Sequence, residues 1–188
     1  TLGGAHSVNM VHLTDVKVPV ENRVGEEGKA WTYAKGLLAH ERTGLAGISR
    51  SLVALEKLRK QAGGVTRGNG SLLDDPSYSL KLSELEVELM ATEFTELRSL
   101  ASAAAGAEPG PESSILKLKG TEIQQKIQKL TVEAGGIYSA AWGATPVGHT
   151  FAHGGMSGYL ASRAYTIYGG ASEVQRDVVA KNVLGLKK

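Results

Sequence analysis

Residues Tyr165 to Leu186 read Y-T-I-Y-G-G-A-S-E-V-Q-R-D-V-V-A-K-N-V-L-G-L, and this stretch is the most informative part of the chain. Gly169 and Gly170 permit backbone angles and close approaches that a side chain would forbid, so the pair predicts a break between two helices. Ser172, followed three residues later by Gln175, predicts a capping box at the start of a helix that runs to the C-terminus. A glycine turn that leads into a helix N-terminus presents backbone donors to an anionic or carbonyl-rich ligand, although most such turns have no ligand.

The composition is that of an ordinary globular protein and argues against several kinds of partner. The chain has 188 residues, 41% of them hydrophobic and 21% charged, with a formal net charge of +2. A nearly neutral chain is not expected to bind nucleic acid or an anionic membrane. Cysteine is absent, which excludes disulfides and thiolate metal sites in this chain and fits a cytoplasmic location. No apolar run is long enough to span a bilayer. Because the chain begins with Thr1 rather than Met, we expect it to be a C-terminal piece of a longer protein.

The spacing of apolar residues predicts a mainly α protein. Val16, Val18 and Val20 occupy alternate positions, which is the pattern of a half-buried strand, so residues 1–28 are expected to be a short β segment. Residues 29–188 are expected to form an antiparallel helical bundle, because five helical segments are separated by short breaks that carry glycine or proline. The first helix is expected to present one continuous apolar face, and the others are expected at Ser79–Ala105, from Pro111 to Gly135–Gly136, at Met156–Ile167 and from Ser172 onward. The predicted inner stripes are Val87, Met90, Phe94, Leu97 and Ala101 for the second helix, and Ile115, Leu118, Ile123, Ile127 and Leu130 for the third.

Glu41 is the candidate catalytic residue because it interrupts the apolar face of the first helix. A carboxylate is costly to bury, so it must be paired, protonated or directed into a cavity, and desolvation makes it a stronger base. The alternative is a partly exposed glutamate at a bend, or one that pairs with a lysine or arginine of another helix. The other positions on its helical face are all apolar: Trp31, Ala34, Leu38, Leu45, Ile48, Leu52 and Leu55.

Two stretches resemble the acyl-CoA dehydrogenase family, flavoenzymes that remove two hydrogens from a CoA thioester. One is the glycine turn, and the other is Leu37–Arg50, L-L-A-H-E-R-T-G-L-A-G-I-S-R. In the commoner branch of that family the base is a glutamate in the turn, as Tyr-Glu-Gly, whereas this chain has Tyr168-Gly169-Gly170. In the isovaleryl-type and long-chain-type branch the base lies on the first long helix, just before an arginine, and Glu41-Arg42 matches that placement. Loss at one position and gain at the other are coupled, which makes the resemblance more specific.

The resemblance implies a role for each matching position. Glu41 would remove a proton from the carbon next to the thioester carbonyl, and a hydride would pass from the β carbon to FAD. Arg42 would lie near the CoA moiety, although a single arginine is more often a surface ion-pair residue. Residues 1–28 resemble the end of the middle β-domain of the family. By the same resemblance, Gly169 and Gly170 would contact the substrate, and the residues near the cofactor would be Gly135, Gly136, Ala171, Ser172 and Glu173.

Some positions depart from the family pattern. Val132 stands where the family usually has the glutamine of Gln-x-x-Gly-Gly, so only a backbone contact from Gly135 and Gly136 carries over. Ala171 replaces a common threonine. The Arg-x-x-Phe-Gly flavin motif is not evident, and the region Arg67–Pro76 ends in L-L-D-D-P instead. These departures leave open a second function, that of a non-catalytic or assembly subunit of a heteromeric acyl-CoA dehydrogenase.

The resemblance also predicts partners. They are an acyl-CoA substrate, with dicarboxylyl or bulky ring-bearing acyl groups suggested by H-E-R-T, and electron-transfer flavoprotein or a similar acceptor. A homo-oligomer or heterotetramer is expected to assemble through the helical domain. The fragment alone is expected to be inactive. No metal site is expected, because His149 and His153 lie in a glycine-rich loop without a nearby acidic ligand.

Overall fold

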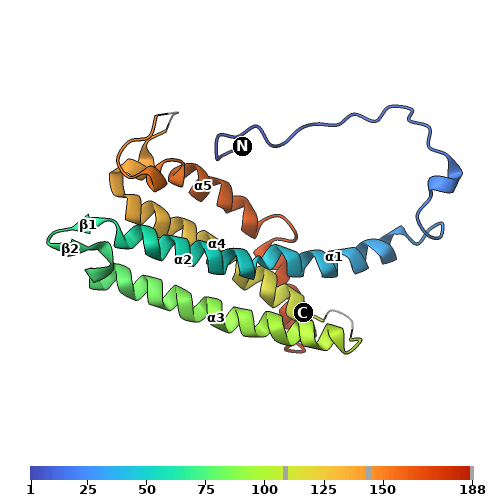
Figure 1. Cartoon of the computed structure of the whole chain (residues 1–188). Coiled ribbons are helices and arrows are strands. Elements are labelled where there is room, and N and C mark those ends of the chain that lie inside the picture. Colours follow the sequence, from blue (N-terminus) through green and yellow to red (C-terminus); the bar gives the residue numbers. More distant parts are fainter. Residues whose placement is uncertain (108–109, 143–144, 187–188) are drawn as a thin grey trace.

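Helices make up most of the chain, and a long extended segment precedes them in the computed structural model (Figure 1). The structure describes residues 1–107, 110–142 and 145–186, and the side chains of residues 39, 40, 42 and 43 lie outside that description. The antiparallel bundle predicted from the sequence is confirmed. Its α-helices are α1 (Ala30–Ala46), α2 (Ile48–Gly63), α3 (Pro76–Ala104), α4 (Glu112–Gly135), α5 (Gly155–Ala161) and α6 (Ser172–Asn182).

Short elements connect the helices. Strands β1 (Thr66–Arg67) and β2 (Gly70–Ser71) form an antiparallel pair between α2 and α3, with Thr66 opposite Ser71. Asp75 starts α3, because its carboxylate accepts from the backbone N–H groups of Ser77 and Tyr78. The 3-10 helices are Val20–Asn22, Leu72–Asp74, Gly136–Ala140, Thr150–Ala152 and Ser162–Thr166.

Helix α4 is the central element, because it packs against α1, α2, α3, α5 and α6. Its predicted residues Ile123, Ile127 and Leu130 are buried as expected, whereas Ile115 and Leu118 are only half-buried. Each fully buried aliphatic side chain stabilises the fold by about 1.5–3 kcal/mol relative to exposure. The core around α4 includes Leu55, Leu58, Leu82, Leu85, Leu89 and Leu116.

The prediction of one continuous first helix is wrong, because the helix is interrupted at Gly47. This residue has φ of +60° and ends α1 at Ala46, and Ile48 begins α2. A left-handed glycine is a common helix C-terminus. Periodicity runs unchanged through the break, so the apolar pattern alone gave no sign of it.

The inner stripe predicted for the second helix is also wrong. Val87, Met90, Phe94 and Leu97 are 51% to 67% exposed, and Ala101 is exposed as well. Helix α3 has apolar residues on more than one face, and its sequence does not say which face meets α4. The residues that α3 buries are Tyr78, Leu82, Leu85, Leu89 and Thr92.

The strand expected in residues 1–28 is not formed. Val16, Val18 and Val20 are exposed, and the segment has no paired strand among the described residues. A strand is stabilised by a neighbouring strand that satisfies its backbone groups, and a lone segment lacks one.

Two helix ends differ from the prediction as well. Helix α6 stops at Asn182 rather than at the C-terminus, and the helix predicted at Met156–Ile167 is α5 followed by a 3-10 helix. Within the described residues, no helix has the length and apolarity that crossing a membrane requires.

Candidate functional site

The paired glycines of the predicted turn lie between the 3-10 helix Ser162–Thr166 and α6. Both have a left-handed backbone, with φ of +65° at Gly169 and +94° at Gly170, and side chains disfavour this region. Space also requires glycine, because a Cβ at Gly169 would overlap Leu45 Cδ1 of α1, and one at Gly170 would overlap Nε2 of Gln175. The turn is therefore in direct contact with both α1 and α6.

Two buried side chains hold this turn by its carbonyl groups. Lys117 Nζ on α4 donates to the Gly170 carbonyl at 2.7 Å, and Gln175 Nε2 on α6 donates to the Gly169 carbonyl at 3.3 Å. Both side chains are fully buried. Because the bond from the ammonium is charge-assisted, it is stronger than a bond between neutral groups. The backbone of the turn is thus fixed from two helices.

The capping box predicted at Ser172 is wrong. Helix α6 begins at Ser172, so its N-cap is Ala171, which makes no side-chain capping bond. Ser172 Oγ donates instead to the Thr166 carbonyl at 3.4 Å. Gln175 is buried beside the turn, and its amide contacts the carbonyl of Gly169 rather than the N-cap. Both side chains therefore bond to carbonyl groups that precede α6, in place of the backbone N–H groups that a capping box would satisfy.

The face of α4 that holds the turn also fixes the end of α1, the helix that carries Glu41. Gly120 lies so close to Ala46 that a Cβ would overlap the Ala46 carbonyl oxygen. Gln124 Nε2 donates to the carbonyls of Leu45 and Ala46, at 3.2 and 2.9 Å. The last carbonyls of a helix have no partner within it. Helix α4 therefore supplies the C-terminal cap of α1.

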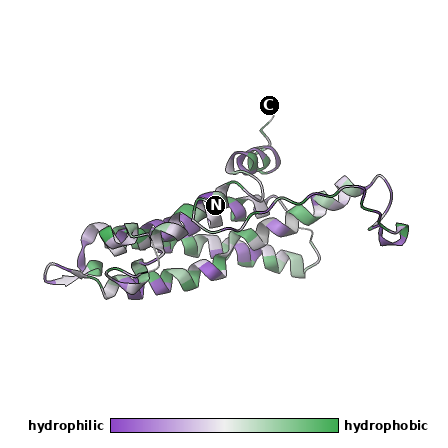
Figure 2. Ribbon diagram, turned by 90° about the horizontal axis from the view of Figure 1, so that it is seen from above, coloured by the Kyte–Doolittle hydropathy of each residue, from purple (hydrophilic) through white to green (hydrophobic). Residues whose placement is uncertain are grey.

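The structure brings the helix of Glu41 and the glycine turn together. Glu41 lies one helical turn before Leu45, on the same face of α1, and Gly169 packs against Leu45. Glu41 is exposed in this chain, as the alternative of a surface glutamate expects. The first half of α1 extends beyond the bundle (Figure 2), where Trp31 and Leu37 are 69% and 70% exposed. The predicted apolar face around Glu41 is thus buried only in its second half.

The remaining predicted residues fall into two places. Ala171, Ser172 and Glu173 follow the turn at the start of α6, where Ser172 is buried and Glu173 is exposed. Gly135 and Gly136 lie at the C-terminal end of α4, about 27 Å along the helix from Lys117 by the rise per residue. The structure therefore does not bring this second glycine pair to Glu41. The side chain of Arg42 lies outside the described residues.

Two buried polar atoms border the two glycine pairs and lack a hydrogen-bond partner in the described part of the chain. They are Ser139 Oγ and Gln175 Oε1. Ser139 Oγ occupies the space where Gly135 would carry a Cβ, and the amide of Gln175 does the same at Gly170. Buried polar atoms in native proteins are nearly always satisfied by protein, water or ligand. Each pair of glycines therefore adjoins a group with capacity for one more hydrogen bond.

A hollow of about 1180 Å³ lies beside α1, between the end of α3 and the start of α4. Its wall on α1 is Gly44, three residues after Glu41, and the space at the Cβ position of Gly44 is open. Small residues supply much of the remaining wall, including Ala101, Ser102 and Ala103 of α3. The hollow beside Gly44 is therefore wide, and its described wall consists largely of small residues.

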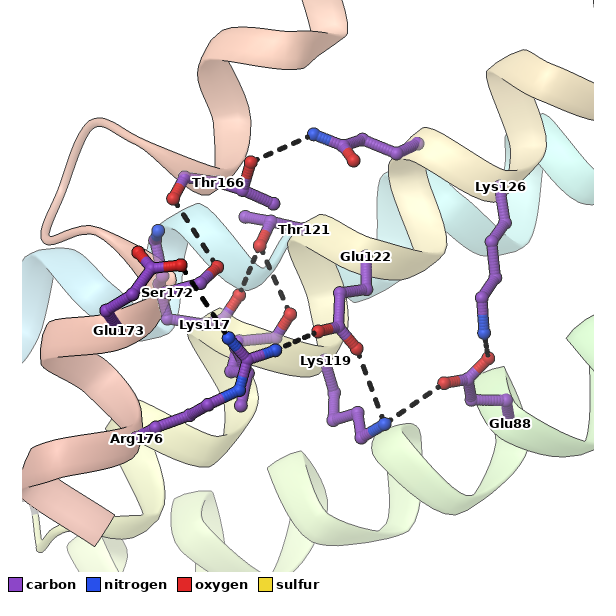
Figure 3. A network of polar contacts seen from close by, with 12 residues as sticks. Glu88, Lys117, Lys119, Thr121, Glu122, Lys126, Thr166, Ser172, Glu173 and Arg176 are labelled. Carbon is purple, nitrogen blue, oxygen red and sulfur yellow. Dashed lines mark hydrogen bonds and ion pairs between the residues drawn. The ribbon is translucent and has the colours of Figure 1, made fainter.

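An ion-pair network ties α6 to α4 and α3 close to the turn (Figure 3). Arg176 contacts Glu122 at 3.1 Å, Lys119 contacts Glu122 at 3.4 Å and Glu88 at 3.3 Å, and Lys126 also pairs with Glu88. Burial alone would raise the pKa of Glu88, but hydrogen bonds and charges from Lys126 and Lys119 outweigh it and lower the pKa. Burial would lower the pKa of Lys119, but Glu122 and Glu88 outweigh it and raise the pKa. The network thus favours its charged form.

Sequence reasoning does not predict the positioning residues Lys117, Gly120 and Gln124, and it predicts a different role for Gln175. The first three follow one another at steps of three and four, in phase with the buried Ile127. They share the feature that drew attention to Glu41, namely a non-aliphatic residue on an apolar helical face. Lys117 is flanked by leucines on both sides, and the apolar spacing predicts the more exposed of these, Leu118, as part of the inner stripe.

A family model described as the C-terminal domain of acyl-CoA dehydrogenase matches residues 28–184. The chain belongs to the acyl-CoA dehydrogenase family. The resemblance read from the glycine turn and from the helix of Glu41 is thereby confirmed, and so is the fold class that it implied. The match begins at the boundary where the predicted β segment meets the helical bundle.

Known acyl-CoA dehydrogenases resemble this chain along nearly its whole length. FadE26 of Mycobacterium tuberculosis is 30% identical over 181 residues, which cover 94% of this chain and 45% of FadE26. The ChsE4-ChsE5 complex from Mycobacterium tuberculosis has a TM-score of 0.76 at 28% identity, and covers 93% of this chain and 45% of that chain. A variant of the Tcur3481-Tcur3483 steroid ACAD has a TM-score of 0.76 at 26% identity, over 91% of this chain and 44% of that one. The chain thus spans less than half the length of the curated relatives just compared.

Proposed function

We propose that this chain is the C-terminal part of an FAD-dependent acyl-CoA dehydrogenase, with residues 1–28 as the end of its middle β-domain. The observation that carries the proposal is the contact of Gly169 with Leu45. It places the glycine turn, which lacks the glutamate of the commoner branch, against the one helix that carries a glutamate at the alternative position. A base on α1 and a turn that accommodates the substrate then belong to one site.

The proposed chemistry is α,β-dehydrogenation, with Glu41 as the base. Its carboxylate takes the proton from the carbon next to the thioester carbonyl. The paired glycines present a backbone without side chains next to α1, and backbone N–H groups near the turn donate to the thioester oxygen, which favours the charge that develops there. FAD, when bound, accepts the hydride from the β carbon. Electron-transfer flavoprotein or a similar protein would then receive the electrons.

The residues around the two glycine pairs fit a polar cofactor. Ser139 Oγ and Gln175 Oε1 are buried and have unused hydrogen-bonding capacity among the described residues. At Gly136, φ is +55° and the space at the Cβ position is open, so its backbone is accessible. We propose that Ala171, Ser172 and Glu173 at the start of α6 contact FAD, and that Gly135 and Gly136 contact the flavin of a neighbouring subunit.

The acyl group that this site takes is proposed to be bulky. The hollow beside Gly44 is wide, and much of its wall consists of small residues. One solved structure similar to this chain is described as a steroid ACAD. Arg42, next to the proposed base, is proposed to bind the CoA moiety.

An exposed apolar stripe on α3 supports assembly through the helical domain. This outer stripe of α3 consists of Leu80, Val87, Met90, Phe94 and Leu97, all more than half exposed. Exposed apolar patches of this kind commonly mark protein–protein contacts. We propose that a second subunit covers the outer stripe in a homo-oligomer or heterotetramer.

A non-catalytic or assembly subunit remains the second candidate. Val132 replaces the glutamine of the cofactor motif, and one similar solved structure is a complex of ChsE4 with ChsE5. In that case the chain would serve its partner chiefly through the outer stripe of α3, and Glu41 would be dispensable for turnover.

Replacement of Glu41 by Gln distinguishes the two candidates. The test uses the intact protein encoded by the gene, flanking sequence included, with a panel of acyl-CoA thioesters and an artificial electron acceptor. The Glu41→Gln variant is expected to lose at least 100-fold in turnover, because proton abstraction is removed. Glu56→Gln, an exposed glutamate on α2, is the matched control and is expected to keep full turnover. Undiminished turnover by Glu41→Gln would exclude it as the base.

A further inference from the structure

Lys117 is the only charged side chain that is fully buried within the described part of the chain. Burying an ammonium group is costly unless the group is paired and hydrogen-bonded. Within the proposed function, neither proton abstraction nor hydride transfer uses a lysine at this place. Its burial therefore calls for another role, and its surroundings indicate one.

Lys117 belongs to a row of three residues on α4 that each contact an element of the site. Its Nζ donates to the Gly170 carbonyl at 2.7 Å, and its side chain also adjoins Gly169, where Cε would lie 3.8 Å from a Cβ. Gly120, one turn later, touches the end of α1. Gln124, one turn further, caps the carbonyls of α1. One rigid helix thus sets the position of both the turn and the helix of Glu41.

The glycine turn needs such support because it has no side chains of its own. Glycine has more backbone freedom than any other residue, so two in succession would otherwise sample many conformations. A charge-assisted bond to the Gly170 carbonyl fixes the plane of the following peptide. It also draws electron density toward that oxygen, which strengthens the N–H on the opposite side of the same peptide as a donor.

We propose that Lys117 is a positioning residue for the reaction: it orients the Gly169–Gly170 turn relative to the helix of Glu41. This inference rests on the proposed function for its catalytic consequence, but its structural part is independent of it. Lys117 touches the backbone of the turn, and its effect on the substrate is exerted through that backbone.

Selective alkylation tests the structural part in the 188-residue chain. Because the chain has no cysteine, a Lys117→Cys variant can be modified at one position in denaturant and then refolded. Bromoethylamine restores an ammonium at nearly the length of lysine, whereas bromopropane gives an apolar side chain of the same length. Hydrogen exchange of the peptide Tyr165–Gln175, followed by mass spectrometry, reports on the turn. The propyl form is expected to exchange about tenfold faster than the aminoethyl form.

The matched control carries the same two modifications at Lys129, whose side chain is 65% exposed on the same helix. Both Lys129 forms are expected to exchange like the unmodified chain. If the two Lys117 forms exchange alike at the turn, the ammonium does not hold it and the proposal is wrong. If the propyl form does not refold, Lys117→Gln, which keeps a donor, and Lys117→Met are compared in its place, with the same expectation.

Steady-state kinetics of the intact protein test the catalytic part. Lys117→Met is expected to lower kcat by roughly 10- to 100-fold through misplacement of the turn, while KM changes less than threefold. Lys117→Gln is expected to recover part of kcat, and Lys129→Met to leave it unchanged. An unchanged kcat in Lys117→Met overturns the proposal even if Glu41→Gln is inactive. Full turnover by Glu41→Gln would instead overturn the proposed function, so the two failures are distinguishable.

Discussion

The two halves of α4 are buried to a similar extent but are built from different chemistry. The buried residues of the second half are nearly all apolar, and four of them belong to the core that also contains residues of α2 and α3. Those of the first half are largely polar or lack a side chain, and among them Lys117 contacts the glycine turn and Gly120 contacts the end of α1. The second half buries Ile123, Ile127, Leu130, Ala134 and Gly135, and the first half buries Ser113, Ser114, Leu116, Lys117, Gly120 and Thr121.

The difference separates stability from positioning. Burial of apolar surface is non-directional, so the second half holds the bundle together without fixing any one atom. Hydrogen bonds have preferred distances and angles, so Lys117 and Gln124 fix the carbonyls that they contact. We infer that the apolar residues of the second half of α4 supply most of the folding energy, and that Lys117 and Gly120 of the first half, together with Gln124 just past the midpoint, supply the geometry of the site.

The largest expected effect on stability comes from the second half. Ile127→Ala removes a buried side chain of the core and is expected to lower the free energy of unfolding by about 2–5 kcal/mol, measured by urea denaturation. Val53→Ala on α2, where the side chain is 71% exposed, is the control and is expected to change stability by less than about 0.5 kcal/mol. Equal effects from the two variants would contradict the placement of the core.

A change in the glycine turn is expected to have the next largest effect. Gly169→Ala introduces a Cβ at φ of +65° and against Leu45, and is expected to cost about 1–3 kcal/mol in unfolding free energy. A Leu45→Ala background should reduce that cost, because it removes the overlap and leaves only the backbone strain. A double-mutant cycle measures the coupling. A coupling of zero would show that the turn does not press on α1.

The ion-pair network gives a smaller, pH-dependent effect. The pKa of Glu88 is lowered in the folded state, so its stabilisation is present above the ordinary value of 4.5 and is lost as pH falls through the folded pKa. The pKa of Lys119 is raised, so its contribution is present below the ordinary value of 10.5 and is lost as pH rises through the folded pKa.

Comparison with a Glu88→Gln variant isolates the acid limb of this effect. The midpoint temperature of thermal unfolding is expected to fall less steeply between pH 5 and pH 3 in the variant than in the unaltered chain. At neutral pH the free energies of unfolding of the two proteins are expected to differ by about 1 kcal/mol or less. If the midpoint temperature of the variant and of the unaltered chain falls equally with decreasing pH, Lys119 and Lys126 do not stabilise the Glu88 carboxylate in solution.

The outer stripe of α3 is expected to contribute least to the stability of the single chain. Phe94→Glu changes a residue that is 61% exposed, so the unfolding free energy of the isolated subunit is expected to change by less than about 0.5 kcal/mol. Light scattering of the intact protein should instead show a lower mass. A mass unchanged at all concentrations would exclude the outer stripe as a subunit contact.

Helix existence was predictable from the sequence, and the orientation of helix faces was predictable only in part. The third predicted helix has its glycine end and its residues Ile123, Ile127 and Leu130 as expected. For α3 the predicted stripe is the exposed one, because Phe94 and Leu89 are both apolar and only Leu89 is buried. Periodicity identifies an apolar face, but a helix that contacts both its own core and a partner has two of them.

The sequence predicts candidate site residues where a residue type is unusual for its position. Glu41 and the paired glycines stood out, because a carboxylate on an apolar face and two successive glycines each need a reason. Lys117 needs a reason as well, but its partner is a backbone carbonyl 53 residues away. The sequence contains no sign of that contact, since any residue supplies a carbonyl. The break at Gly47 was missed because it leaves the periodicity intact.

Exchange of the substrate α-proton with solvent is the most direct test of the central claim, that Glu41 is the base of a site assembled by α1, α4 and the glycine turn. The intact protein is incubated with a saturated acyl-CoA in D2O without an electron acceptor, and deuterium at the α carbon is measured by mass spectrometry. We expect the unaltered protein to incorporate deuterium and the Glu41→Gln variant to incorporate none above the uncatalysed rate. Incorporation by Glu41→Gln at the unaltered rate would contradict the account.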